Sequence, residues 1–177
     1  MSNSPTLPLE FTAQQLFDMC TKALKDASKA RFDASLIRGQ SPRIVINGDE
    51  EQARQIRELR EQAQELEDKA KRSNAVANEH AQALVGSTVI LTGKIFRDAD
   101  EWVSGMPGLL GSGHNVTNTH SLDVESSKHT ITRVKTIREQ FMDSTTIRFY
   151  FNYHGGSEYY FELPHRPYKG ELKVEFA

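Results

Sequence analysis

Residues 149–165 read FYFNYHGGSEYYFELPH, two aromatic runs on either side of a glycine pair. So many aromatic rings are typical of either a stacking surface for bases or the core of a β-hairpin. The pairing register of the hairpin decides between them, because it determines which rings are buried. A two-residue loop, Gly155-Gly156, would pair Phe151 with Tyr160 and mix apolar and charged groups on both faces. We therefore expect a three-residue loop, residues 154–156, with a glycine in the left-handed conformation.

That register sorts the hairpin into two faces. Every residue of one face is then apolar: Ile147, Phe149, Phe151, Tyr153, Tyr159, Phe161 and Leu163. On the other face the cross-strand pairs are Arg148 with Glu162, Tyr150 with Tyr160, and Asn152 with Glu158. Tyr150 and Tyr160 are predicted to be exposed, and acidic rather than basic residues flank them, so a nucleic-acid surface is disfavoured. The aromatics are predicted to be mainly core.

β-type patterns fill the chain after Gly86. Segments rich in β-branched and aromatic residues, separated by short turn-like clusters, predict antiparallel strands at residues 87–96, 129–137, 145–153, 158–163 and 171–176. Between the first two lies a glycine-rich stretch, residues 105–118, which we expect to be a loop and therefore the best place to look for function.

Helical patterns fill the chain before Gly86. Thr12 and Gln15 form a capping box that begins a helix expected to run to about Arg31, and Asp49 caps a second that runs to about Leu84. The predicted fold is α+β: an N-terminal helical arm, residues 1–85, whose second helix is long and coiled-coil-like, followed by an antiparallel β domain, residues 86–177.

The second helix carries a thin heptad seam that needs a neighbouring helix. The seam residues expected at an oligomer interface are Ile56, Leu59, Ala63, Leu66 and Ala70. The neighbour is either the first helix of the same chain or the same helix of another subunit. We prefer the second, because the first helix is expected to be much shorter than its partner.

Composition narrows the class of protein. The formal net charge is −2, so no global field draws the chain to nucleic acid or anionic lipid. Cys20 is the only cysteine, which excludes a disulfide within the chain, and no secretion signal or membrane-spanning run is recognisable, so a cytoplasmic location without a membrane partner is expected. No catalytic motif is present, and we expect no enzyme activity and no cofactor.

Two groups of residues could bind a ligand. His114, His120 and His129 have spacings that match no metal motif, so no metal site is predicted. An anion site is conceivable where the glycine-rich loop meets the basic strand, residues 128–138, through backbone N–H groups and cationic side chains. Its candidate residues are Gly111, Gly113, His114, Arg133, Lys135 and Arg138. Alternation puts Ile131 and Arg133 on one face of that strand, so neither face is clearly a core face. The strand is therefore predicted to lie at the edge of the sheet or to line a ligand-binding site.

The functional expectation follows from the long helix. We expect a non-enzymatic, homo-oligomeric interaction or accessory protein, of a bacterial or bacteriophage type, that assembles through this helix and presents its β domain to another protein. The alternative is a protein that binds or sequesters a phosphorylated small molecule or nucleotide through the glycine-rich loop and the basic strand.

Overall fold

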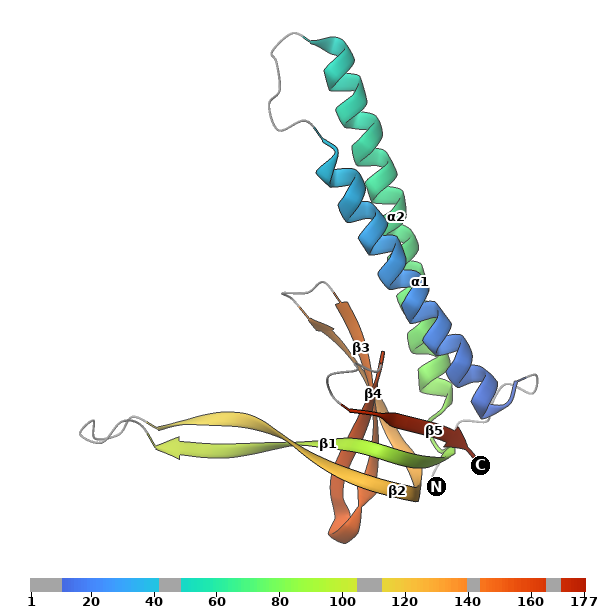
Figure 1. Ribbon diagram of the computed structural model, residues 1–177, viewed down its shortest axis with the longest axis vertical. Coiled ribbons are helices and arrows are strands. Elements are labelled where there is room, and N and C mark those ends of the chain that lie inside the picture. Colours follow the sequence, from blue (N-terminus) through green and yellow to red (C-terminus); the bar gives the residue numbers. More distant parts are fainter. Residues whose placement is uncertain (1–10, 42–48, 105–112, 140–143, 165–169) are drawn as a thin grey trace, which may run out of the picture.

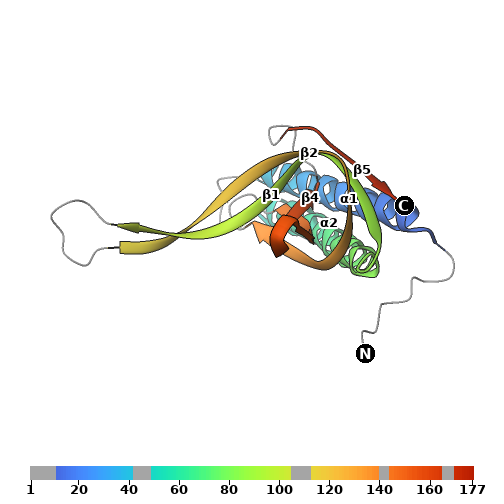
Figure 2. The same cartoon turned by 90° about the horizontal axis from the view of Figure 1, so that it is seen from below.

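Two helices followed by a five-stranded antiparallel sheet make up the α+β fold, as predicted (Figure 1). The computed structural model describes residues 11–41, 49–104, 113–139, 144–164 and 170–177; of residues 100–104, 113–116, 139 and 154 it describes the backbone only. The helices project from the sheet as a hairpin arm, and a long two-stranded ribbon leaves the sheet in another direction (Figures 1 and 2).

Local capping begins both helices at the predicted residues. Helix α1 spans Ala13–Gly39: the Gln15 backbone N–H donates to Thr12 Oγ1 at 3.2 Å, and the Thr12 backbone N–H donates to Gln15 Oε1 at 2.8 Å. Helix α2 spans Glu50–Ala83 and starts with Gln52 donating to Asp49 Oδ1. The expected end of α1 at Arg31 is wrong, because no proline or glycine interrupts the chain before Gly39.

The two helices pack against each other within the chain. Alanines make the close contact: Ala27 and Ala30 of α1 meet Ala70 of α2 in one buried cluster. Of the five seam residues, three are buried and two, Leu59 and Leu66, are half-buried. Helix α1 therefore packs on the seam at Ala70, and it is longer than the prediction of intersubunit packing assumed. A further contact of the seam with another subunit stays a prediction. Packing of the two helices within one chain is the alternative to intersubunit packing that the sequence left open.

The strands form one sheet in the order β2-β3-β4-β1-β5, with β1 also pairing β2, so that the sheet closes on itself. Their bounds are β1 Thr88–Ser104, β2 Gly113–Glu139, β3 Ser144–Tyr153, β4 Ser157–Leu163 and β5 Leu172–Phe176. Strands β1 and β2 are far longer than predicted, and residues 113–118 of the expected loop are strand. Cross-strand pairing supplies hydrogen bonds that compensate for their polar, glycine-containing sequence.

The β3–β4 hairpin has the predicted register. Arg148 lies opposite Glu162 and Tyr150 opposite Tyr160, and Gly155 in the connecting 3-10 turn η1 (His154–Gly156) has a φ of 74°. The prediction that Tyr150 and Tyr160 are exposed is wrong, since they are only 7% and 1% exposed. Closure of the sheet brings Phe96 of β1 against them.

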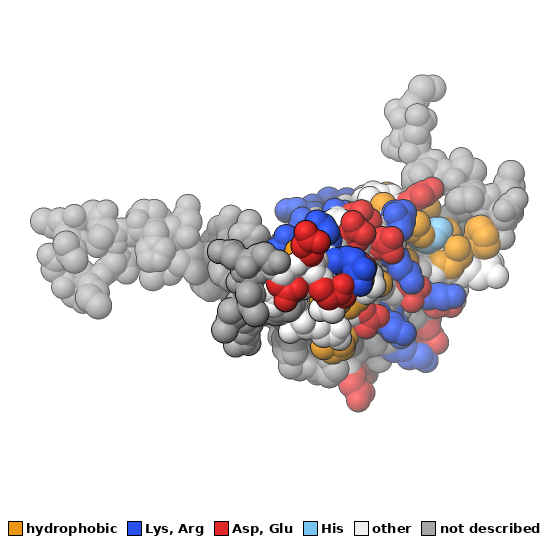
Figure 3. Space-filling model, turned by 90° about the horizontal axis from the view of Figure 1, so that it is seen from above, with side chains coloured by type: hydrophobic (Ala, Val, Ile, Leu, Met, Phe, Trp, Pro, Cys, Tyr) orange, Lys and Arg blue, Asp and Glu red, His pale blue; other side chains and the backbone are white. Residues whose placement is uncertain are grey.

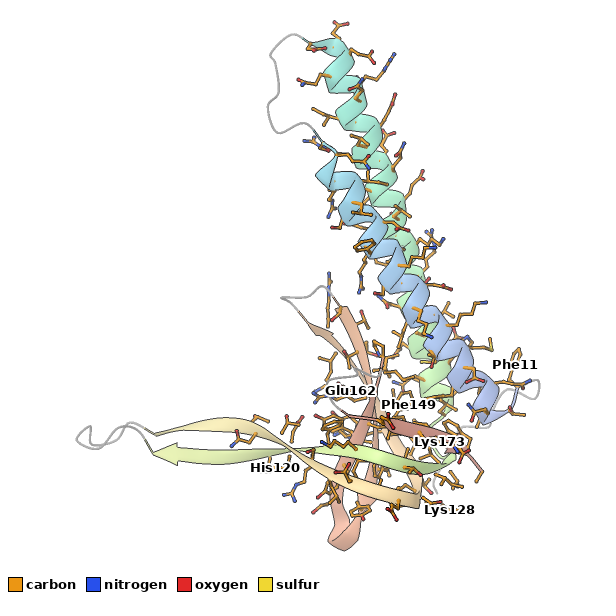
Figure 4. The ribbon with its side chains drawn as sticks, in the orientation of Figure 1. Phe11, His120, Lys128, Phe149, Glu162 and Lys173 are labelled. Carbon is orange, nitrogen blue, oxygen red and sulfur yellow. The ribbon has the colours of Figure 1, made fainter. Side chains whose placement is uncertain are left out.

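One main core joins the base of the helical hairpin to the inner face of the sheet. Leu16, Phe17 and Cys20 of α1 belong to the same buried cluster as Phe149 and Phe161. The rings of Phe149 and Phe161 stack with their centroids 4.9 Å apart, and Figure 4 shows Phe149 where the sheet meets the base of the helices. The far half of the helical hairpin lies beyond this core (Figure 1). Among the described residues, no helix is long and apolar enough to cross a membrane.

Candidate functional site

The basic strand is the C-terminal part of β2, and a bulge changes its faces. Ile131 lies opposite Phe151, but Arg133 already lies opposite Tyr150, so Thr132 is the extra residue. Ile131 therefore faces the core, whereas Arg133 faces outward with Tyr150; the expectation that they share a face is wrong. The Arg133 guanidinium pairs with both carboxylate oxygens of Glu158 and lies over the Tyr150 ring at 3.7 Å.

The residues of the predicted anion site are not gathered in one place. Gly113 and His114 lie opposite Ser104 and Val103 at the start of β2, at the far end of the ribbon from Arg133 (Figure 1). Lys135 is exposed opposite Arg148 on the sheet. Gly111 lies outside the described residues. The structure therefore gives no support for an anion site that combines the glycine-rich stretch with the basic strand.

Arg138 instead joins a cleft between the helical hairpin and the β2–β3 end of the sheet. The cleft has a volume of about 780 Å³, within the roughly 300–1,000 Å³ range of small-molecule sites. Its lining comes from both helices and both strands: Arg31, Arg38, Glu67, Lys71, Asn74, Thr136, Arg138 and Thr145. We call this the basic cleft, because four of its eight described lining residues are cationic and one is acidic.

Contacts across the basic cleft join the two parts of the fold. Arg31 Nη2 donates to Thr145 Oγ1 at 3.1 Å, which connects α1 to β3. Arg38 Nη2 lies 2.5 Å from Glu67 Oε1, which connects α1 to α2. The side-chain oxygen of Asn74 is buried and accepts no hydrogen bond from the described residues. A buried acceptor without a donor is costly, and a water molecule in the cleft is enough to satisfy it.

Positive and negative side chains are intermixed on the face of the molecule that is seen from above the helical arm (Figure 3). The chain as a whole has 22 basic and 24 acidic residues. Among the described residues that line the basic cleft, four are cationic and one is acidic, and one of the four, Lys71, also pairs with Asp68 at 3.0 Å.

A second polar cluster lies on the outer face of the sheet. Asp98 of β1 accepts hydrogen bonds from Thr119, Tyr160 and Arg148. Burial opposes ionisation of Asp98, but the donated hydrogen bonds and the Arg148 charge outweigh it and hold the pKa of this carboxyl below its ordinary value. Glu162, only 3% exposed, lies 3.4 Å from Arg148 Nε, which corrects the prediction that its face of the hairpin is solvated.

Tyr160 acts as a hydrogen-bond donor in this second cluster. Burial, followed by its hydrogen bond to Asp98, raises the pKa of the Tyr160 hydroxyl far above its ordinary value. The hydroxyl therefore stays protonated at neutral pH. The Arg148 guanidinium lies over the same ring at 4.1 Å from its centroid. These contacts join three strands, so we assign the cluster to holding β1, β3 and β4 together, although the buried Arg148 Nε makes no hydrogen bond within the described residues.

The histidines lie apart from the basic cleft. His120 lies opposite Arg97 in the ribbon, and Figure 4 shows it on β2, away from the helices. His129 stacks on Phe151 with ring centroids 4.5 Å apart. Within the described residues, no three His, Cys, Asp or Glu side chains are grouped in a way that could hold a metal ion.

Sequence reasoning identified Arg138 and missed the other cations of the basic cleft. Arg31 and Arg38 are seven residues apart on α1, a spacing that places both on one helix face. The seven-residue spacing could have predicted that the two arginines share a helix face. It could not have predicted that this face lies toward β2 and β3. No protein-family model, curated protein or solved structure matches this chain.

Proposed function

We propose that this chain is a non-enzymatic interaction protein whose first partner is another copy of itself and which binds through the β1–β2 ribbon. The observation that carries the proposal is the ribbon itself. After Phe96 contacts β4, strands β1 and β2 continue as eight consecutive residue pairs, from Arg97 with His120 to Ser104 with Gly113. In this stretch the described strands pair only with each other.

A two-stranded ribbon that extends away from its sheet is unfavourable for an isolated chain. A two-stranded ribbon alone is marginally stable in water, and its outer edges offer unpaired backbone N–H and C=O groups to another chain. Strand addition is a recurring way in which such edges bind partners. The register also places Trp102, the only tryptophan of the chain, opposite Asn115 within the ribbon.

The helical arm offers a second contact surface. Phe32 and Leu36 are 64% and 52% exposed and lie four residues apart on α1, so they share one face of the helix. Single exposed apolar residues are ordinary, but two large ones side by side on a projecting arm favour a contact with another protein. We propose that this pair supports the association made by the ribbon.

Light scattering on the full chain tests the proposal. At micromolar concentration the wild type is expected to have a mass of at least twice the 20.0 kDa chain. A shortened variant, with residues 100–117 replaced by Asn-Gly as a tight turn between Ala99 and Asn118, is expected to be folded and monomeric. The double variant Phe32→Ser/Leu36→Ser is expected to weaken association without abolishing it.

Two results would contradict the proposal. A monomeric wild type would exclude self-association, and a shortened variant that keeps the wild-type mass would exclude the ribbon as the interface. Circular dichroism of each variant shows whether the fold is retained.

A further inference from the structure

We propose that the outer edge of β5 is a contact surface for the β5 edge of a second copy of the chain, which pairs with it antiparallel about a twofold axis. Strand β5 spans Leu172–Phe176 and, among the described strands, pairs only with β1. It lies at the rim of the molecule when the fold is seen from below (Figure 2). The contact is separate from the ribbon, so it can form whether or not the ribbon binds.

The register with β1 determines which backbone groups of β5 face outward. The Glu171 carbonyl accepts a hydrogen bond from β1, and the Ala177 N–H donates one to the chain just at the start of β1. The odd-numbered residues of β5 therefore face β1, because successive residues alternate in an antiparallel ladder. The even-numbered residues Leu172, Val174 and Phe176 present their N–H and C=O groups to the outer edge.

One of these outward groups has a partner in the chain. The Phe176 N–H donates to the Gln14 side-chain oxygen of α1 at 3.4 Å, a long hydrogen bond that agrees with the outward direction of the even-numbered residues. Within the described part of the chain, no strand or side chain makes a hydrogen bond to the outward groups of Leu172 and Val174. A strand edge with free N–H and C=O groups binds another extended strand.

The side chains of β5 alternate in a way that fits a second β5. Leu172, Val174 and Phe176 are half-buried against the main core, whereas Lys173 and Glu175 are exposed. In an antiparallel pair centred on Val174, each Lys173 lies opposite Glu175 of the second copy, and each Leu172 lies opposite Phe176. Opposite charges therefore meet on the outer face, and apolar side chains meet on the core face.

The backbone and the charges agree on this centre. Because Val174 faces outward, the two copies of Val174 would exchange both of their N–H···O=C bonds, as directly opposite residues do in an antiparallel pair. A slip of two residues in either direction would place Lys173 opposite Lys173 or Glu175 opposite Glu175. Lys173 and Glu175 already lie 2.9 Å apart within the strand, so the four charges of the pair would alternate in sign.

A contact made by one strand of 5 residues from each chain is small. It buries less than the about 1,200 Å² of a stable interface, so we expect a dissociation constant on the order of 0.1–1 mM. At micromolar concentration this contact leaves the ribbon-shortened variant monomeric. Within an assembly that the ribbon holds together, the same contact is strengthened by the high effective concentration of the strands.

Sedimentation equilibrium of the full chain and of the ribbon-shortened variant, between about 10 μM and about 1 mM, tests the contact. The average mass is expected to rise with concentration, and at about 1 mM at least roughly half of the shortened chains should be paired. Lys173→Glu and Glu175→Lys each place like charges opposite each other and should weaken pairing about tenfold or more. Lys25→Glu, at an exposed position of α1, is the control and should leave pairing within about twofold.

An equal mixture of the two β5 charge variants separates contact between copies from the ion pair within one strand. In a mixed pair every substituted side chain lies opposite a charge of the other sign, although the Lys173–Glu175 pair within each strand stays broken. The mixture is therefore expected to regain the pairing of its parent within about twofold. The same samples in the full chain should show the same order, which keeps the test valid if the shortened chain does not fold.

Three results would overturn the proposal. The first is a shortened, folded chain that stays monomeric at about 1 mM. The second is a β5 charge variant that pairs as well as its parent, and the third is a mixture that pairs no better than either variant alone. None of these results bears on the ribbon, because the ribbon is tested by the mass of the wild type at micromolar concentration.

Discussion

At the scale of single residues, Asp98 shows how this sheet satisfies charge on its outer face. Its donors come from three strands: Thr119 of β2, Arg148 of β3 and Tyr160 of β4. Because β1 otherwise meets β4 at a single residue pair, Phe96 with Tyr160, side-chain contacts carry much of the closure. The carboxylate form of Asp98 is the one that all three donors stabilise.

Asp98→Asn should therefore change how stability depends on pH. The pKa of Asp98 in the folded chain lies below its ordinary value of 3.8, so the unfolded chain takes up a proton more readily as pH falls. Its contribution is present above about pH 4 and is lost as pH drops through the folded pKa. At pH 7 the variant should lose about 1–3 kcal/mol of unfolding free energy, and its stability should fall less than that of the wild type as the pH is lowered from about 5 to about 3.

Urea unfolding at neutral and at acidic pH measures this difference, with Asp123→Asn, an exposed carboxylate of β2, as control. Parallel pH profiles for wild type and Asp98→Asn would show that the hydrogen bonds to Asp98 do not favour its charged form. Glu158, whose pKa is lowered by its hydrogen bonds from Arg133, should keep part of the acid sensitivity in the variant.

At the scale of elements, one glycine decides whether β5 can reach β1. Gly93 lies at a register shift of β1 with a φ of 121°, and the next residue, Lys94, donates its backbone N–H to the Glu171 carbonyl at 3.1 Å. A Cβ at Gly93 would lie 2.0 Å from that carbonyl oxygen. Both the backbone conformation and the close approach therefore require glycine.

Gly93→Ala is expected to lower the free energy of unfolding by about 2–4 kcal/mol, because either the strained φ persists or β5 moves away from β1. Gly39→Ala is the control: a methyl group there would have no atom within 4 Å and the φ is not positive, so this change should be neutral or slightly stabilising. Thermal unfolding compares the two. Equal midpoints would show that β5 does not depend on this contact.

Elements with strong local signals were predictable from sequence, and those made by tertiary contact were not. The β3–β4 register followed from the alternation of its aromatics, and the start of α1 from Thr12 and Gln15. The bulge at Thr132 has no local signal, since Ile131 and Arg133 alternate as ordinary strand residues. The site follows the same division: Arg138 is visible in a basic strand, but the basic cleft exists only because the helical hairpin docks beside it.

At the scale of the whole molecule, the helical hairpin has two ends in different surroundings. Near the sheet, Ala77, Ala81 and Leu84 at the end of α2 lie in the main core with the aromatic residues of β3 and β4. Farther out, Ala63 and Ala70 are buried, Ala70 in a cluster of alanines alone. An alanine buries little apolar area, so the outer half gains less from packing than the inner half.

Hydrogen exchange followed by mass spectrometry should therefore show a gradient along α2. Amides of residues 50–66 are expected to exchange faster than those of residues 74–83, because the outer hairpin can open without breaking the main core. Ala63→Gly should speed exchange in the outer segment and leave the inner one nearly unchanged. Uniform protection along α2, or an equal response of both segments to this substitution, would mean that the arm and the sheet unfold as one unit. A second copy docked on Phe32 and Leu36 would also slow exchange in the outer half, so dilution below the association range should restore the gradient if self-association hides it.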